Sequence, residues 1–137
     1  MTEQVKKKFL YINRKAPHGT VYALEALEVV LIGAAFEQDV SLAFIDDGVY
    51  QLMAGQDPGS IGLKNFSKTF RALGDYDVRK LYVERESLEE RGLRQDDLIA
   101  VTYEDEDEDY AEKPALFVID RSEMARVIGS QDVVLSF

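Results

Sequence analysis

Short apolar runs, each followed by polar turn residues, recur along the whole chain. The first is KFLYI at residues 8–12, which leads into a polar segment where Pro17 and Gly19 interrupt regular structure. Further runs of this kind lie at residues 40–45, 81–83, 98–103 and 133–137. We predict a strand at each of them. The run ALFVI at 115–119 is predicted to be either another strand or the apolar start of the last helix.

Helical segments alternate with these runs. Thr20 is a suitable N-cap for a helix from residue 21 to about residue 36, and glycines close the later segments. The later helical segments are predicted at 49–53, 65–73, 87–91 and 121–128. This alternation favours a single α/β domain over residues 1–137, with a mostly parallel sheet of about five strands and helices on both faces.

The helix predicted at 21–36 has apolar residues on two sides. One side follows the spacing of a single helical face, with Leu24, Leu27, Leu31 and Ala34. Val29, Ile32 and Phe36 fall on the opposite side. A helix that covers one face of a sheet needs only one apolar stripe. The second stripe is therefore predicted to be covered either by more of this chain or by a partner subunit, and the small size of the domain favours a subunit interface.

The net charge of −10 is dominated by one segment. The run EDEDED at 104–109 supplies six carboxylates, and without them the chain has 20 acidic and 16 basic residues. We predict an acidic, solvated, mobile loop over about 104–113; a docking tail for a basic partner is the alternative. The rest of the chain lacks the basic stripe of a nucleic-acid-binding protein, so direct binding of nucleic acid is not expected.

Neither a membrane segment nor a secretion signal is expected. The sequence has no apolar stretch of 18 residues, and the apolar run after the first lysines is too short for the core of a signal peptide. We therefore expect a cytoplasmic protein.

Cysteine is absent, and His18 is the single histidine. The chain itself therefore has no thiolate nucleophile, no persulfide carrier, no disulfide and no cysteine-ligated metal. Metal sites built on several imidazoles are excluded in the same way. We predict that His18 is a loop histidine held by hydrogen bonds.

Two adjacent carboxylates, Asp46 and Asp47, directly follow the apolar run at 40–45 and precede Gly48. The carboxyl ends of strands are where ligands collect in open α/β sheets, so three interpretations compete. A phosphoacceptor or magnesium site resembling a response-regulator receiver domain is disfavoured, because no lysine follows the last strand. Acid–base catalysis is disfavoured because chain neighbours rarely converge on one substrate. We favour a turn that ends the strand and caps the following helical segment.

Six segments, spread in order over nearly the whole chain, form a recognisable set. They are APHGT (16–20), IDDGVYQL (45–52), GQDP (55–58), FRALGDYDV (70–78), SLEERGL (87–93) and DVVLSF (132–137). Together they resemble the TusC/DsrF family of sulfur-relay proteins, whereas no single segment would be specific. The N-terminal part and the acidic insertion look closer to the DsrF branch, which is associated with sulfur oxidation, than to TusC, which is associated with tRNA 2-thiouridine formation.

The resemblance implies a three-layer DsrE-like fold and a heterohexamer of three homologous subunits. These would be DsrE, DsrF and DsrH or TusD, TusC and TusB, with a TusE/DsrC-like protein as the sulfur acceptor. In that family the cysteine that carries the persulfide belongs to sister subunits, so no catalytic residue is carried over to this chain and no cofactor or metal is expected. The implied role is that of a non-catalytic subunit.

Overall fold

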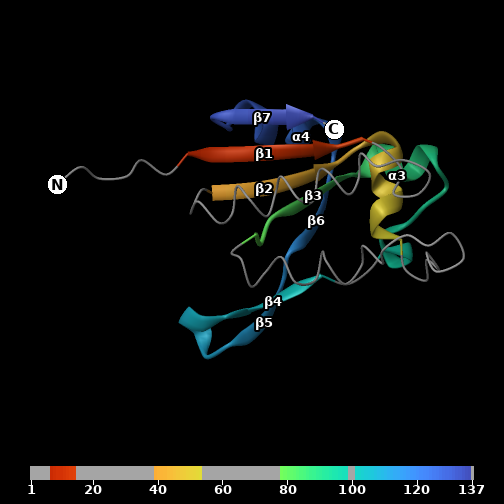
Figure 1. Ribbon diagram of the computed structural model, residues 1–137. Coiled ribbons are helices and arrows are strands. Elements are labelled where there is room, and N and C mark those ends of the chain that lie inside the picture. Colours follow the sequence, from red (N-terminus) through yellow and green to blue (C-terminus); the bar gives the residue numbers. More distant parts are fainter. Residues whose placement is uncertain (1–6, 15–38, 54–77, 99–100, 137) are drawn as a thin grey trace, which may run out of the picture.

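A five-stranded parallel sheet organises the fold (Figure 1). The computed structural model describes residues 7–14, 39–53, 78–98 and 101–136. Within them the sheet has the strand order β6-β3-β2-β1-β7, and every neighbouring pair is parallel. The strands are β1 (Lys8–Asn13), β2 (Asp39–Phe44), β3 (Leu81–Glu84), β6 (Leu116–Ile119) and β7 (Val133–Ser136). The prediction of a mostly parallel α/β sheet of about five strands is confirmed, and ALFVI proves to be a strand.

Alternate residues of the strands supply two apolar clusters, one on each face of the sheet. Leu42 and Phe44 of β2 belong to the larger cluster, whereas Ala43 between them belongs to the smaller one. This alternation follows from the two-residue period of a strand. Because both faces are covered, the strands read as continuous apolar runs, which is typical of parallel sheets.

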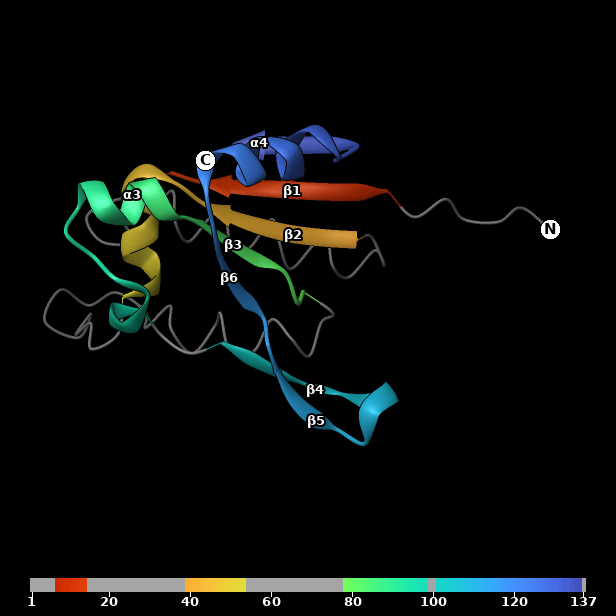
Figure 2. The same cartoon turned by 180° about the vertical axis from the view of Figure 1, so that it is seen from behind.

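Helix α4 (Arg121–Gly129) lies on one face, which is turned toward the reader in Figure 2. Its N-cap is Asp120, whose carboxylate accepts a hydrogen bond of 2.8 Å from the backbone N–H of Glu123. Met124 is buried in the smaller cluster, where Val127 packs against it. The helix predicted at 121–128 is thus confirmed, and burial of its apolar side holds it to the sheet.

The opposite face packs against shorter elements at the carboxyl ends of the strands. These are the 3-10 helix η1 (Asp46–Leu52) and the helix α3 (Arg85–Glu90), which lie beside each other (Figure 1). Val49 and Leu88 bury their side chains in the larger cluster. Both elements begin earlier than predicted. The 3-10 helix η1 starts at Asp46, and α3 starts at Arg85, two residues before Ser87.

The acidic segment, predicted to be a solvated, mobile loop over about 104–113, has regular secondary structure. It forms an antiparallel hairpin from β4 (Thr102–Asp105) and β5 (Ala111–Pro114), joined by the 3-10 turn η5 (Glu106–Glu108). Lys113 offsets part of the charge repulsion, because its ammonium lies 2.8 Å from carboxylate oxygens of both Asp105 and Glu108. The hairpin stands apart from the five-stranded sheet (Figures 1 and 2).

Of the strand predicted at 98–103, the described residues place only Thr102 and Tyr103 in a strand, β4. Leu98 and Val101 are buried in the larger cluster, but β4 begins only at Thr102 and pairs with β5 instead of joining the parallel sheet. An isolated bridge joins Leu98 to Met53. Burial in the core, rather than pairing in the parallel sheet, accounts for the apolar character of Leu98 and Val101.

Several predictions fall outside the described residues. They are the helices at 21–36 and 65–73, the interface residues Val29, Ile32 and Phe36, and His18. Among the residues that the structure describes, no helix is both long and apolar enough to cross a membrane.

Candidate functional site at the carboxyl ends of the strands

The turn after β2 brings Asp46 and Asp47 to the edge of the sheet where parallel strands end. Asp46 has a φ of 50°, in the left-handed region that aspartate adopts more readily than most residues. The N-cap of η1 is Ile45, so no side chain caps this helix. The predicted capping role for an aspartate side chain is therefore not seen, and the two carboxylates bond elsewhere.

Gly48 fits this turn tightly against the end of β1. The backbone N–H of Ile45 donates to the carbonyl of Asn13 at 3.2 Å, and the N–H of Gly48 donates to the carbonyl of Ile45 at 2.9 Å. A Cβ on Gly48 would overlap the carbonyl group of Asn13. The turn therefore requires a residue without a side chain here, because backbone atoms cannot yield as a flexible side chain can.

The carboxylates of Asp46 and Asp47 bind two different arginines. Asp46 Oδ2 lies 3.3 Å from Nε of Arg14, which follows β1, and Asp47 Oδ1 lies 3.0 Å from Nη2 of Arg91, which follows α3. The aspartate side chains are 47% and 60% exposed, respectively, so each ion pair contributes little to stability. The two carboxylates are engaged by separate cations from separate elements, and they do not form a convergent pair.

A buried hydroxyl links this turn to β3. The backbone N–H of Asp46 donates to Ser87 Oγ at 2.9 Å, and Ser87 Oγ donates to Glu84 Oε1 at 2.7 Å. Ser87 is fully buried, and Glu84 is nearly so. A hydroxyl that both accepts and donates satisfies two polar groups that would otherwise lose their hydrogen bonds to water.

Arg121, the first residue of α4, belongs to the same cluster. Its Nη2 lies 3.3 Å from Glu84 Oε1 and 3.4 Å from Glu90 Oε1, and its backbone N–H donates to the carboxylate of Glu86 at 2.9 Å. The hydrogen bond to Glu84 and the charge of Glu84 raise the pKa of Arg121. The buried Glu84 carboxylate therefore has a permanent cation beside it.

Together these residues form a network that connects the ends of β1, β2, β3 and β6. We call it the carboxyl-edge network; its members are Arg14, Asp46, Asp47, Glu84, Ser87, Arg91 and Arg121. Its acidic groups are paired with arginines, and its contacts join residues at four strand ends. Among the described residues, no group of three or more histidines, cysteines, aspartates or glutamates is placed to hold a metal ion.

The sequence identified only part of this network. Asp46, Asp47 and Gly48 were recognised from their position after an apolar run, and the structure places them together at the strand end. Arg14, Glu84, Ser87, Arg91 and Arg121 were missed. Four of them share a signal of position, because Glu84 ends β3 while Arg14, Ser87 and Arg121 lie just beyond β1, β3 and β6.

Comparison with known proteins gives one relative over nearly the whole chain and others over about two-thirds of it. The chain is 57% identical over 134 residues, 98% of each chain, to a protein of Allochromatium vinosum named "Intracellular sulfur oxidation protein DsrF". It is 39% identical over 89 residues, 65% of this chain and 75% of the relative, to a "Protein TusC homolog" of Vibrio parahaemolyticus. The Escherichia coli "Protein TusC" shows the same identity over 87 residues, 64% of this chain and 73% of the relative.

A solved structure and a family-level match complete the comparison. The crystal structure of the E. coli ychN protein superimposes with a TM-score of 0.71 over 97% of this chain and 100% of that one, at 20% identity, which supports the fold alone. The sequence model of the DsrE/DsrF-like family matches residues 7–137. The chain therefore belongs to the DsrE/DsrF-like family.

Proposed function

We propose that this chain is a non-catalytic subunit of a cytoplasmic sulfur-transfer complex of the DsrEFH or TusBCD type, most closely of the DsrF kind. The observation that carries the proposal is the 57% identity, over 98% of both chains, with a protein named for intracellular sulfur oxidation. In this proposal the chain supports persulfide relay by cysteines of sister subunits.

The chemistry of sulfur relay explains why such a chain needs partners. In each step a cysteine thiolate attacks the outer sulfur of a donor persulfide, the S–S bond breaks, and the donor cysteine leaves as a thiolate. None of the 137 residues is a cysteine, so this chain can neither attack nor carry the sulfur. Its contribution would be to shape and hold the surroundings of a thiolate on another subunit.

Two features support a role in assembly. The carboxyl-edge network pairs carboxylates with arginines at one edge of the sheet, where the turn at Asp46 and Asp47 lies. The second apolar stripe at 21–36, formed by Val29, Ile32 and Phe36, is proposed to lie at a subunit interface. The proposed partners are DsrE/TusD-like and DsrH/TusB-like subunits and, indirectly, a TusE/DsrC-like sulfur acceptor; nucleic acid and membrane are not proposed as direct partners.

Co-expression tests the proposal. An affinity tag on this chain, expressed together with its genomic neighbours, is expected to retain two proteins of similar size, at least one of which contains cysteine. After treatment with a persulfide donor, mass spectrometry should find one added sulfur on a sister cysteine, and a Cys→Ser variant of that sister should abolish it. A solitary monomer that turns over a substrate by itself would overturn the proposal.

A matched pair of variants tests the interface. Ile32→Asp places a charge in the apolar stripe and is expected to abolish retention of the sister subunits, whereas Ile32→Leu keeps the stripe apolar and should retain them. Equal retention by both variants, with the tagged chain folded, would contradict the assignment of this stripe to an interface.

The second candidate is a TusC-type subunit that serves tRNA 2-thiouridine synthesis. The observation in its favour is the 39% identity to TusC proteins, although it extends over only about two-thirds of this chain. Deletion of the gene separates the two pathways. Loss of 2-thiouridine from tRNA supports the TusC type, and loss of growth on stored or reduced sulfur with intact tRNA supports the DsrF type.

A further inference from the structure

The strand β7 forms one edge of the parallel sheet and is apolar on both of its faces (Figure 1). Val134 lies beside Leu10 of β1, on the face that carries α4, and Leu135 lies beside Tyr11, on the opposite face. The two side chains are 40% and 39% exposed, respectively. Apolar residues on both faces are typical of a strand inside a sheet, where neighbouring strands and layers cover it.

The apolar side chains of β7 do not belong to the core. Among the residues that the structure describes, Val133, Val134 and Leu135 pack in neither of the two apolar clusters, and no strand pairs with the outer side of β7. In a parallel ladder, alternate residues direct their backbone N–H and C=O groups away from the partner strand. The outer side of β7 therefore offers a second strand both apolar side chains and backbone hydrogen-bonding groups.

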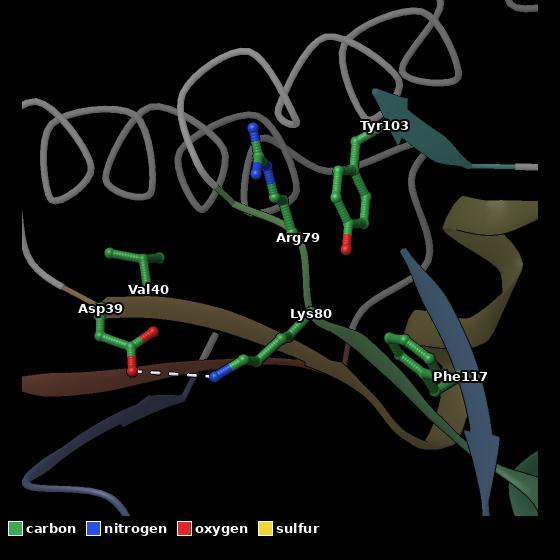
Figure 3. A pocket seen from close by; sticks show the side chains of 6 residues that line it. All are labelled: Asp39, Val40, Arg79, Lys80, Tyr103 and Phe117. Carbon is green, nitrogen blue, oxygen red and sulfur yellow. Dashed lines mark ion pairs between the residues drawn. The ribbon is translucent and has the colours of Figure 1, made fainter. Parts of the chain in front are cut away.

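The other edge strand, β6, is packed against the rest of the chain. Leu116 and Val118 pack against the larger cluster. The ring centre of Phe117, between them, lies 6.2 Å from that of Tyr82. Figure 3 shows that Phe117 lies at the end of the sheet where Tyr103 of the hairpin also lies, and both residues line the same hollow. The two edges of the sheet thus differ, because the residues of β6 have partners within this chain.

The sequence of β7 lacks the residues that protect an exposed edge strand. Such strands usually carry a lysine, another charged residue or a proline, which prevents pairing with a second chain. The four residues Val133–Ser136 are valine, valine, leucine and serine. An apolar edge without such protection is expected to be covered by another strand in the native assembly.

The charge of the chain favours a second copy of β7 in an antiparallel arrangement. Two copies with a net charge of −10 repel each other overall, but β7 itself carries no charged side chain. The nearest carboxylate along the chain is that of Asp132, which already accepts a hydrogen bond of 2.8 Å from the backbone N–H of Lys8. In an antiparallel pair the two copies of Asp132 lie at opposite ends of the paired strands, so these like charges are kept apart.

A second copy of β7 also matches this edge on both faces. Antiparallel pairing about a two-fold axis perpendicular to the sheet places the α4 faces of both copies on the same side. Val134 then lies at an apolar contact on one face, and Leu135 at an apolar contact on the other, with β-branched and aliphatic pairs across the strands. A two-fold contact uses the same surface of both copies and is closed, so it ends at two copies.

We propose that two copies of this chain associate through β7, which pairs antiparallel with β7 of the second copy. The two five-stranded sheets thereby become one continuous sheet. This inference goes beyond the proposed function and does not depend on it, because the contact needs no sister subunit. It uses neither the carboxyl-edge network nor the stripe at 21–36.

Analytical ultracentrifugation of the purified full-length chain, without sister subunits, tests the proposal. A reversible equilibrium between monomer and dimer is expected as the protein concentration rises. Val134→Lys places a protecting lysine on the edge and should weaken the association about tenfold or more. Tyr110→Lys makes the same change in net charge at a hairpin residue that is 64% exposed, and it should leave the association unchanged.

Two outcomes would overturn the proposal. One is a chain that stays monomeric at every concentration, and the other is a Val134→Lys variant that dimerises as well as the original chain. Circular dichroism verifies that the variants are folded. Failure of the proposed function would show itself separately, as a loss of sister subunits in the co-expression experiment.

Single cysteines locate the contact, because the chain has none of its own. A short bismaleimide crosslinker, which joins two thiols that lie close together, is expected to give a covalent dimer of the Val134→Cys variant. The Tyr110→Cys variant carries its thiol on the hairpin and is expected to stay largely uncrosslinked. Equal crosslinking of the two variants would show that the dimer is not formed through β7 and would reject this interface.

Discussion

Gly48 lies directly against the backbone carbonyl of Asn13, so that the turn after β2 is seated on the end of β1. A Cβ added at Gly48 would overlap the carbonyl oxygen and carbon of Asn13, and Arg14 N would also be close. Asn13 is buried and its carbonyl already accepts the N–H of Ile45. The start of η1 is therefore fixed by contact with main-chain atoms that cannot move without distorting the sheet.

Gly48→Ala is accordingly expected to destabilise the protein strongly. The added methyl group forces a backbone shift, and overpacking of this kind costs about 3 kcal/mol of the free energy of unfolding. Urea denaturation followed by circular dichroism measures the change.

Gly129→Ala is the matched control, because a Cβ added at Gly129, the last residue of α4, would have nothing within 4 Å. The control should be neutral or stabilising by up to about 1 kcal/mol. Equal effects of the two variants would contradict the close packing at Gly48.

Ser87→Ala is expected to uncouple α3 from the turn. The variant removes the acceptor of the Asp46 N–H and the donor to Glu84 in one change. Because both groups lie in a buried environment, the expected loss is about 2 kcal/mol of unfolding free energy. Ser130→Ala, which removes an exposed hydroxyl bonded to the Val127 carbonyl, should cost less than about 0.5 kcal/mol. A loss at Ser87 as small as that at Ser130 would contradict a structural role for the hydroxyl.

The sheet could be predicted because its signal is local. The three central strands β1, β2 and β3 place side chains in the apolar clusters of both faces, so each appears in the sequence as a short apolar run. The run at 98–103 shows the limit of this rule. Leu98 and Val101 are buried in the core, yet they lie outside the strands of the parallel sheet, because an apolar side chain reports burial rather than hydrogen bonding between strands.

The acidic hairpin could not be predicted from charge density alone. Repulsion among neighbouring carboxylates suggested a loop, but the contacts that oppose it come from Lys113, several residues further along the chain. The carboxyl-edge network likewise depends on contacts between residues that lie far apart in the sequence. The turn at Asp46–Gly48 could be read from adjacent residues, whereas its bond to Ser87 joins positions 41 residues apart, which no local pattern specifies.

Asp105 of the hairpin is expected to take up a proton at a lower pH than an ordinary aspartate does. The hydrogen bond from Lys113 is the largest cause that lowers the pKa of Asp105 below its ordinary value of 3.8. A carboxyl group whose pKa is lower in the folded protein stabilises the fold fully above the unfolded pKa, and that contribution is lost as the pH falls through the lowered value. Folded hairpin structure should therefore persist to a pH below 3.8 before Asp105 protonates.

Carbon-13 NMR of the carboxyl groups measures this titration. Lys113→Gln should return the Asp105 pKa toward its ordinary value, and Arg79→Gln should raise it by a smaller amount, because Arg79 contributes only through its charge. Lys80→Gln serves as the control and should leave Asp105 unchanged. An Asp105 pKa that does not respond to Lys113→Gln would show that their 2.8 Å ion pair is not maintained in solution.

The double variant Asp46→Ala with Asp47→Ala separates assembly from catalysis. Both side chains are about half-exposed and their ion pairs contribute little to folding, so the isolated chain is expected to remain folded. Without the carboxylates, Arg14 and Arg91 lose their ion pairs with this turn, although Arg91 keeps its contacts with the Ser87 carbonyl and with Glu90, and this edge of the sheet becomes less acidic. We expect weaker retention of the sister subunits in the co-expression experiment.

The control Glu106→Ala with Asp107→Ala removes the same charge from the exposed hairpin and should retain the sister subunits normally. Intact assembly combined with the loss of a small-molecule activity of the isolated chain would instead support a carboxylate enzyme and reject the structural role of this turn.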